Sequence, residues 1–523
     1  MYREFICTPH EPIVETKLGK LHGFKADGLY QFRGIRYATS ERFMMPKPVE
    51  PWDGVVNAWA YGPTCPTNNP NTPGIQFVSD YRFWVEDENC QYLNVWTPTI
   101  DKNAKKPVLV WIHGGAHEQG SPISRLCYDC ADISEKGDMV VISLAHRLNI
   151  LGYLDISEFG DEYKDCVNVG IYDIIEALRW VKNNIEAFGG DADNVTIMGH
   201  SGGGKKVTTL LQMPAAEGLF HKAVVYSGVY DSKAVDSKDS TKIVKAIMKE
   251  LGVDSIPALQ AVPAQAAIDA FNKVKPALIE QGVSTFFGPI PSANYPGSAR
   301  TVGFSEFAKK IPVMMGSVLC EFPLNDSVSD RYNLSEEVKH QILVAHYGSE
   351  HVDEIIALFK EAFPDKDLAD LRTYDTRFRT PMLDYAKKMA AATDTPIYTY
   401  LFTNEFQFDG GRSAWHGSDL PFFFGNAHDF PLYGGFAESE NLERIMSTAL
   451  VNFAHNGNPN GGVVPQWAPY DSQTETTMVF DKVSGTRDHL DQKLQEAIGR
   501  YAPETSISQM KLGKKEHTDS AAI

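Results

Sequence analysis

The chain has 523 residues, 43% of them hydrophobic, and a formal net charge of −18 at pH 7. This length allows a large buried core, and large α/β folds often form a single domain. The acidic balance argues against nucleic acid and anionic membrane surfaces as partners, because both attract basic patches. No segment reaches the roughly 18 consecutive apolar residues that a membrane-spanning helix needs.

Residues 1–7 contain no apolar run followed by a small-residue cleavage site, so the sequence shows no signal peptide. We therefore expect a cytoplasmic protein, or a secreted one if a leader has been removed. The chain has seven cysteines, which a reducing compartment would keep as thiols. Cys127 and Cys130 have the spacing of a redox or zinc pair, but neither a second pair nor a nearby histidine pair accompanies them. We expect no metal and no other cofactor.

Strands and helices are predicted to alternate along the chain. Apolar, β-branched runs predict buried strands at residues 108–112 and 139–144. Apolar residues at helical spacing predict a helix over 171–188, which ends at Gly189 and Gly190. Further predicted elements are a strand before Ser201, a helix after it, strands at 222–226, 311–315 and 397–402, and a helix at 442–455.

Strands separated by helices indicate the α/β class, with a large, mostly parallel sheet covered by helices on both faces. Residues 232–300 are helix-rich without a clear strand, so we expect a helical excursion that roofs the active site. One domain is expected over residues 1–504, followed by a polar, mobile tail over 505–523. In such sheets the sites lie at the carboxyl ends of the strands.

The motif Gly-His-Ser-Gly-Gly at residues 199–203 joins an apolar run to a helix-compatible segment. A strand that turns at once into a helix needs small residues around a strained residue, which here is Ser201. Such an elbow presents the serine hydroxyl as a nucleophile. By itself the motif also fits a purely structural glycine turn.

Three further features complete a candidate site for acyl transfer. The loop His-Gly-Gly-Ala at residues 113–116 follows a predicted strand, so the N–H groups of Gly115 and Ala116, with that of Gly202, can bind an oxyanion. Glu321 follows a predicted strand and is the candidate acid. His416, in a loop of small residues, is the candidate base. Serine, acid and histidine stand in the chain order of α/β-hydrolases.

The chain resembles the type-B carboxylesterases, the cholinesterase-like family of α/β-hydrolases, over residues from about 18 to 481. The resemblance rests on these blocks: Phe-Arg-Gly-Ile-Arg-Tyr-Ala at 32–38, Glu-Asn-Cys-Gln-Tyr-Leu-Asn-Val-Trp at 88–96, His-Gly-Gly at 113–115, Asn-Val-Gly at 168–170 with Asp173, Phe-Gly-Gly-Asp at 188–191, the elbow, Gly-Leu-Phe at 218–220, His-Gly at 416–417 and Asn-Phe-Ala-His-Asn-Gly-Asn-Pro at 452–459.

The resemblance implies a triad of Ser201, Glu321 and His416 and an oxyanion hole of Gly115, Ala116 and Gly202. It also implies two supporting features of the family. Arg42 and Glu88 match a structural ion pair, and Ser227 matches a serine behind the triad. Cys65 and Cys90 match a disulfide of secreted relatives; we expect them reduced or only conditionally bridged here.

The chain departs from the family pattern near the nucleophile. His200 replaces a common glutamate, His117 replaces a common aromatic residue, and Phe322 replaces the glycine that usually follows the acid. His117, His200 and Trp415 are candidate substrate-pocket residues. One hypothesis is that the two histidines favour an anionic or polar substrate; the alternative is that both satisfy local hydrogen bonds.

The sequence thus predicts a serine carboxylic-ester hydrolase that forms a covalent acyl-enzyme on small to medium carboxylate esters. Its activity should fall as the pH drops through the pKa of His416, near neutrality. Two alternatives stay open: a non-catalytic binding protein on the same scaffold, and an amide or thioester hydrolase with the same triad. The expected partner is a small-molecule ester, and the expected state is a monomer or homodimer.

Overall fold

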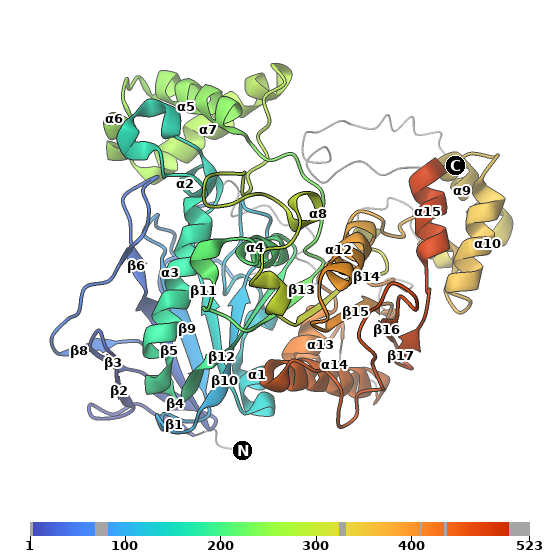
Figure 1. The fold of residues 1–523 in the computed structure, drawn as a ribbon, viewed down its shortest axis with the longest axis horizontal. Helices are drawn as coiled ribbons and strands as arrows, with labels where there is room; N and C mark the ends of the chain where they lie inside the picture. The colour runs from blue at the N-terminus through green and yellow to red at the C-terminus, as the bar shows by residue number, and fades with distance from the viewer. Residues whose placement is uncertain (1–3, 68–81, 324–330, 408–410, 434–436, 502–523) are drawn as a thin grey trace.

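A twelve-stranded sheet runs through the computed structural model, which describes residues 4–67, 82–323, 331–407, 411–433 and 437–501 (Figure 1). The strand order is β1-β4-β5-β9-β11-β10-β12-β13-β14-β15-β16-β17. The seven strands from β11 to β16 in this order pair in parallel, and antiparallel strands flank them on both sides. The predicted α/β class with a large, mostly parallel sheet is confirmed.

The strands have these bounds: β1 Phe5–Ile6, β2 Ile13–Glu15, β3 Lys20–His22, β4 Phe24–Ala26, β5 Leu29–Arg36, β6 Ala38–Thr39, β7 Lys47–Pro48, β8 Val55–Asn57, β9 Tyr92–Thr97, β10 Lys106–Ile112, β11 Val140–Leu144, β12 Gly190–His200, β13 Lys222–Tyr226, β14 Val313–Val318, β15 Ile397–Phe402, β16 Thr477–Phe480 and β17 Gly485–Arg487. The α-helices have these bounds: α1 Ala131–Gly137, α2 Asn149–Tyr153, α3 Val169–Asn184, α4 Gly202–Leu210, α5 Ser237–Leu251, α6 Ile256–Ala261, α7 Ala264–Glu280, α8 Ala299–Val302, α9 Glu336–Tyr347, α10 Val352–Ala362, α11 Leu368–Leu371, α12 Arg379–Ala392, α13 Leu420–Phe424, α14 Ala437–Asn456 and α15 Gln492–Tyr501.

The sheet is apolar on both faces, and each face packs on its own helices. Along β10, Val108 and Val110 belong to one hydrophobic cluster with α3, α4 and α12, whereas Leu109 and Trp111 belong to another with α1, α13 and α14. Successive side chains of a strand point to opposite faces, so a strand covered on both sides has to be apolar at every position. This accounts for the unbroken apolar runs seen in the sequence.

The central strands end level with one another, which brings their following loops together. In the parallel register Ile112 of β10 pairs with Gly199 of β12, and Tyr226 of β13 pairs with both His200 of β12 and Gly316 of β14. The residues after these strands therefore meet at one edge of the sheet. They are the 113–116 loop, Ser201, Ser227 and the 319–323 segment.

Most predicted elements are confirmed with small shifts at their ends. The strand over 397–402 matches β15, and the helix over 171–188 is α3 followed by a 3₁₀ turn, Ile185–Phe188, that ends at Gly189 in the left-handed conformation. β14 starts at Val313, two residues after its predicted start, and α14 starts before 442. Local pattern is least informative at element ends, because capping and packing decide them.

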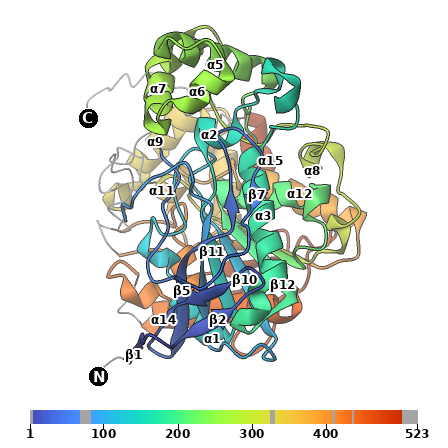
Figure 2. The same ribbon diagram turned by 90° about the vertical axis from the view of Figure 1, so that its left-hand side faces the viewer.

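The predicted helical excursion contains α5, α6 and α7, and no strand of the sheets lies between residues 232 and 300. Figures 1 and 2 both show these helices gathered at the top of the molecule, beyond α2. The excursion returns through residues 283–290, where Phe286 accepts a backbone hydrogen bond from Val235 at 2.9 Å. The tail predicted over 505–523 lies outside the described residues.

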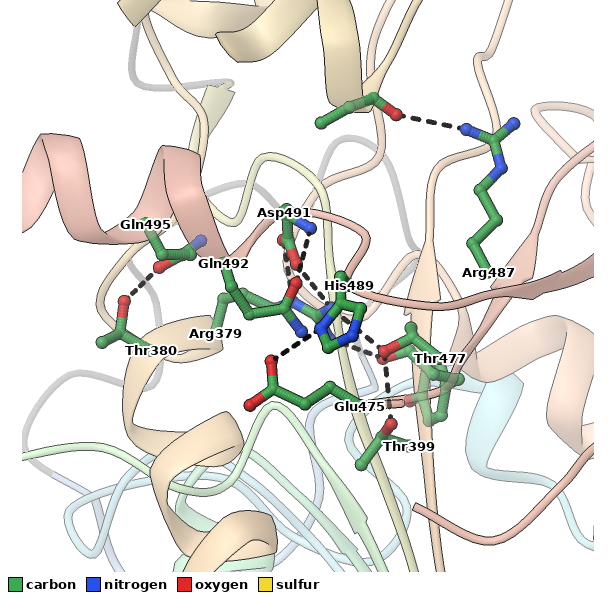
Figure 3. Close-up of polar contacts among 12 residues, drawn as sticks. Arg379, Thr380, Thr399, Glu475, Thr477, Arg487, His489, Asp491, Gln492 and Gln495 are labelled. Carbon is green, nitrogen blue, oxygen red and sulfur yellow. Dashed lines mark hydrogen bonds and ion pairs between the residues drawn. The ribbon is translucent and has the colours of Figure 1, made fainter. Parts of the chain in front are cut away.

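A buried ion pair ties the C-terminal helix to the sheet (Figure 3). Arg379, the first residue of α12, contacts Asp491 at 2.9 and 3.0 Å, and Asp491 immediately precedes α15. The same guanidinium donates to Thr477 of β16 at 3.4 Å. Removing one member would leave a buried charge uncompensated, which costs about 3–5 kcal/mol. The pair therefore fixes the start of α12. The residue just before this helix, Phe378, packs against His416.

No helix in the described part of the chain is long and apolar enough to cross a membrane.

Candidate active site

Ser201 lies at a strained turn between β12 and α4. Its backbone angles, φ 57° and ψ −122°, are ones that residues with side chains rarely adopt. The turn is possible because its neighbours are glycines: a Cβ on Gly199 would lie 2.4 Å from the Gly203 carbonyl carbon. One on Gly203 would lie 2.1 Å from the Ile112 oxygen. The glycines of the motif thus allow close backbone packing around the serine, as expected for a nucleophile elbow.

The 113–116 loop rests directly on this elbow. A Cβ on Gly202 would lie 2.0 Å from the Ala116 carbonyl oxygen, and Ala116 itself has φ 55°. The absence of a side chain at Gly202 therefore leaves room for the Ala116 carbonyl group.

The carbonyl oxygens of three peptides at this point are hydrogen-bonded on the side away from their amides. The Gly114 oxygen accepts from His113 Nδ1 at 2.8 Å, the Gly115 oxygen accepts from the Gln119 amide at 3.1 Å, and the Ser201 oxygen accepts from the Lys205 amide at 2.9 Å. In a trans peptide the amide of the next residue points the opposite way. The bonded carbonyls thus fix the orientation of the Gly115, Ala116 and Gly202 amides, and hydrogen-bonded peptides are better donors.

Glu321 and His416 are in direct contact. His416 Nδ1 hydrogen-bonds Glu321 Oε2, and the His416 amide donates to the Glu321 carbonyl oxygen at 2.7 Å. The other carboxylate oxygen accepts from Ser227 Oγ at 2.6 Å and from the Val318 amide at 3.3 Å. Ser227 thus lies behind the acid, at the position that the resemblance implies. The carboxylate therefore holds the imidazole by one oxygen while its own position is fixed through the other.

Burial governs the protonation of this pair. It raises the pKa of Glu321, which the Ser227 hydroxyl, the Val318 amide and Arg377 oppose. It lowers the pKa of His416 below its usual value, and nearby Arg125 acts in the same direction. The imidazole is therefore neutral well below pH 7, and the expectation of a pKa near neutrality is corrected: desolvation outweighs the nearby carboxylates.

Aromatic rings surround the imidazole of His416. The ring of His200 lies 4.3 Å away, and those of Phe322 and Phe378 lie 5.0 Å away. His200 Nε2 is buried and has no hydrogen-bond partner among the described residues. Burial, and then the His416 charge, lowers the pKa of His200 well below its usual value. The sequence hypothesis that His200 satisfies local hydrogen bonds is therefore wrong for this nitrogen.

The other two candidate pocket residues occupy different surroundings. His117 packs edge-on against Tyr153 at 4.9 Å and lies beside Gly288 of the returning excursion. Trp415 lies in the hydrophobic core against Phe406, at 4.3 Å between ring centroids. Its assignment to the substrate pocket is therefore corrected, because the side chain next to His416 in the sequence points into the core.

Three further pairs of residues were singled out from the sequence. Arg42 and Glu88 form a two-pronged ion pair with both contacts at 2.7 Å. Cys65 and Cys90 are buried free thiols, and burial followed by the adjacent Cys65 raises the pKa of the Cys90 thiol. Cys127 and Cys130 are likewise buried free thiols.

A separate hydrophobic cluster packs against the oxyanion loop and His416. It consists of Tyr230, Phe286 and Phe378, with Ala116 and Phe322 packed against it. Four of its five side chains are aromatic, and they come from four separate segments of the chain. Sequence reasoning identified only Ala116 and Phe322 of this wall, since no local pattern links residues so far apart.

Two other groups near the triad were missed. Asp419 is buried and accepts a hydrogen bond from Tyr400 at 2.6 Å; its charge raises the pKa of His416, and the Glu321 charge raises the pKa of Asp419. Lys206, on α4, is buried and bonds to the oxyanion loop. A signal for Lys206 existed: it stands four residues after Gly202, so helical spacing places both on the same face of α4.

A strained serine between a parallel strand and a helix, with an acid and a histidine on later loops of the same sheet edge, defines the α/β-hydrolase class. Comparison with known sequences narrows this class. The profile of the Carboxylesterase family matches residues 10–497, and the chain belongs to this family of carboxylic-ester hydrolases.

Individual relatives agree over nearly the whole chain. The chain is 39% identical over 488 residues to a phenmedipham hydrolase of Pseudarthrobacter oxydans and 31% identical over 484 residues to the para-nitrobenzyl esterase of Bacillus subtilis (strain 168). Each alignment covers 90% of this chain and 94% of the relative. A solved esterase from anaerobic Clostridium hathewayi, described as able to hydrolyse aliphatic aromatic polyesters, is 41% identical with a TM-score of 0.91, covering 96% of this chain and 100% of that one.

Proposed function

We propose that this carboxylesterase works through a serine acyl-enzyme, with Ser201 as nucleophile, His416 as base and Glu321 as the acid that orients the base. The observation that carries the proposal is the Glu321–His416 contact at the sheet edge where Ser201 occupies its strained turn. His200, the residue before Ser201, packs against His416, so the nucleophile and the base belong to adjoining segments.

In the first half of the reaction, Ser201 Oγ attacks the ester carbonyl carbon while His416 Nε2 takes its proton. Glu321 stabilises the imidazolium through Nδ1. The amides of Gly115, Ala116 and Gly202 bind the oxyanion of the tetrahedral intermediate. His416 then protonates the departing alkoxide, and the acyl group stays on the serine.

In the second half, His416 takes a proton from water, which attacks the acyl carbon; the imidazolium then returns the proton to Ser201 Oγ as the bond to the acyl carbon breaks and the acid is released. Both halves start from a neutral imidazole. Burial lowers the His416 pKa, so the base is free at neutral pH, and kcat/KM should fall only as the pH drops through that lowered pKa.

The aromatic cluster supports apolar acyl or alcohol groups of small to medium size as the substrate class. Phe322 and Phe378 contact the imidazole, and Ala116 lies in the same cluster. A side chain or ring of the ester placed there would displace water and strengthen the electrostatic contacts at the carbonyl. A single domain over 1–504, a cytoplasmic location and a monomeric or homodimeric state stay predictions.

The test compares initial rates on p-nitrophenyl acetate, butyrate and octanoate for the wild type, Ser201→Ala and Ser134→Ala. Ser134 is a buried serine of α1 that bonds Met139, so it controls for loss of a buried hydroxyl. We expect kcat of Ser201→Ala to fall by about 10⁴–10⁶-fold, and Ser134→Ala to keep its rate.

A fluorophosphonate probe completes the test, because it should label the wild type and Ser134→Ala but not Ser201→Ala. Equal rates in the wild type and Ser201→Ala would overturn the assignment of the nucleophile. A folded wild type that neither turns over an ester nor takes the label would favour the binding-protein alternative. Faster cleavage of the matching p-nitroanilide or thioester would favour the alternative leaving groups.

A further inference from the structure

Lys206 is a fully buried lysine directly behind the oxyanion loop. It lies on α4, one turn after Gly202, and its exposed fraction is 0%. Its ammonium nitrogen donates to the Ala116 carbonyl oxygen at 3.0 Å and to the His113 carbonyl oxygen at 3.4 Å. A buried lysine is costly unless its N–H groups are hydrogen-bonded, so these two bonds are what hold the side chain in place.

The surroundings of Lys206 contain imidazoles rather than an acid. Within the described ranges, no carboxylate forms an ion pair with its ammonium group. Its charge helps to lower the pKa values of His113 and His146, whose rings lie 4.7 Å apart. Burial lowers the pKa of Lys206 itself to about 7. No carboxylate in the described ranges neutralises the ammonium form, and developing negative charge at the nearby hole would favour that form over the neutral amine.

The contact acts on a strained residue of the hole. Ala116 has φ 55°, a conformation that costs a residue with a side chain roughly 1 kcal/mol or more. Its carbonyl oxygen faces the first turn of α4, since a Cβ on Gly202 would lie 2.0 Å from it. Lys206 donates to this same oxygen. The bond therefore fixes the peptide group that joins Ala116 to His117.

We propose that Lys206 is a positioning residue for the oxyanion hole: its bonds to the Ala116 and His113 carbonyls fix the loop, and its charge favours the oxyanion. The inference rests on the proposed function of the loop. We therefore expect Lys206 to stabilise the transition state more than it stabilises the bound substrate, because the oxyanion exists only after attack.

The experiment measures kcat, KM and the inhibition constant of an alkyl trifluoromethyl ketone, which forms a tetrahedral adduct with an active serine. It uses the wild type, Lys206→Met, Lys206→Gln and the control Lys222→Met. Lys222 is also a buried lysine with a lowered pKa, but it lies at the opposite end of β13 and bonds Asn194. Thermal unfolding of every variant is recorded beside the kinetics.

Removing one direct oxyanion donor typically costs 10²–10³-fold in kcat, so an indirect contribution should cost about 10–100-fold. We expect Lys206→Met to lose this factor in kcat, to keep KM within about threefold, and to weaken the ketone by the same factor as kcat/KM. Lys206→Gln, which keeps an N–H donor without the charge, should fall between Lys206→Met and the wild type. Lys222→Met should lower the unfolding temperature and leave kcat and the ketone constant unchanged.

Folded Lys206→Met with wild-type kcat and ketone affinity would overturn the proposal, as would an equal loss in Lys222→Met. If Lys206→Met does not fold, the same comparison is made with Lys206→Gln. A loss of ketone affinity that exceeds the change in KM would support the proposal, and wild-type kcat and ketone affinity would overturn it. Fluorophosphonate labelling of the wild type separates the two proposals. A wild type that is not labelled contradicts the serine mechanism, whereas a labelled and active wild type leaves Lys206 to be judged by its own variants.

Discussion

The two sides of the site hold groups of opposite kind, with a base behind the oxyanion loop and acids behind His416. Behind the oxyanion loop lie the Lys206 ammonium and the neutral imidazoles of His113 and His146. Behind His416 lie the carboxyl groups of Glu321 and Asp419, and burial raises the pKa of Asp419 to about 7. Acyl transfer produces an oxyanion on the first side and an imidazolium on the second. Each developing charge thus meets groups that were placed before the reaction starts.

The two sides also differ in how they are built. The oxyanion side depends on backbone packed against backbone, which only glycine permits: a Cβ on Gly202 or Gly203 would lie 2.0–2.1 Å from a carbonyl oxygen. The histidine side depends on side chains, with Phe322 and Phe378 packed on the imidazole of His416. Substitutions should therefore affect the first side through geometry and the second through charge and protonation.

The largest effect after loss of the nucleophile is expected from Glu321→Gln. The amide cannot stabilise the imidazolium, and it can turn its NH₂ toward Nδ1 and favour the wrong tautomer, so kcat should fall by about 10³–10⁴-fold. Steady-state kinetics on p-nitrophenyl butyrate measure the loss. Ser227→Ala, which removes one bond to the same carboxylate, should cost far less, and equal losses in both variants would argue that the acid acts only by holding the loop.

Gly202→Ala should disrupt the backbone packing on the oxyanion side of the site. The new methyl has to move the Ala116 carbonyl, which displaces the loop, and we expect kcat to fall by about 10²-fold with a smaller change in KM. Gly499→Ala is the matched control, because a Cβ there meets nothing within 4 Å and α15 favours alanine. Wild-type kcat in folded Gly202→Ala would show that the contact is not needed to place the amides.

The smallest effect is expected from His200→Glu and appears as a pH shift. A carboxylate beside His416 would stabilise its imidazolium and raise its pKa, so the base would be lost at a higher pH. The acid limb of kcat/KM should move upward by about one pH unit. His200→Gln, which adds no charge, should leave the limb near its wild-type position, and an unshifted limb in His200→Glu would contradict the contact.

The sequence alone was sufficient to predict most of the strands and helices and to name the residues that the proposed mechanism uses. Unbroken apolar runs predicted the parallel strands, since strands buried on both faces need apolar residues at every position. The glycines around Ser201 predicted the elbow, because only glycine permits the close approaches found there. These features follow from local chemistry, which a sequence displays directly.

Tertiary structure decided which distant side chains share the site and in what state of protonation. Lys206 and Asp419 are residues of charged types that usually lie at the surface, yet both are buried, and both pKa values are moved to about 7 by desolvation. Trp415 stands next to His416 in the chain but lies in the core. Burial is a property of the packed whole, so neither the direction of the Trp415 side chain nor the protonation of these buried groups could be read from their neighbours in sequence.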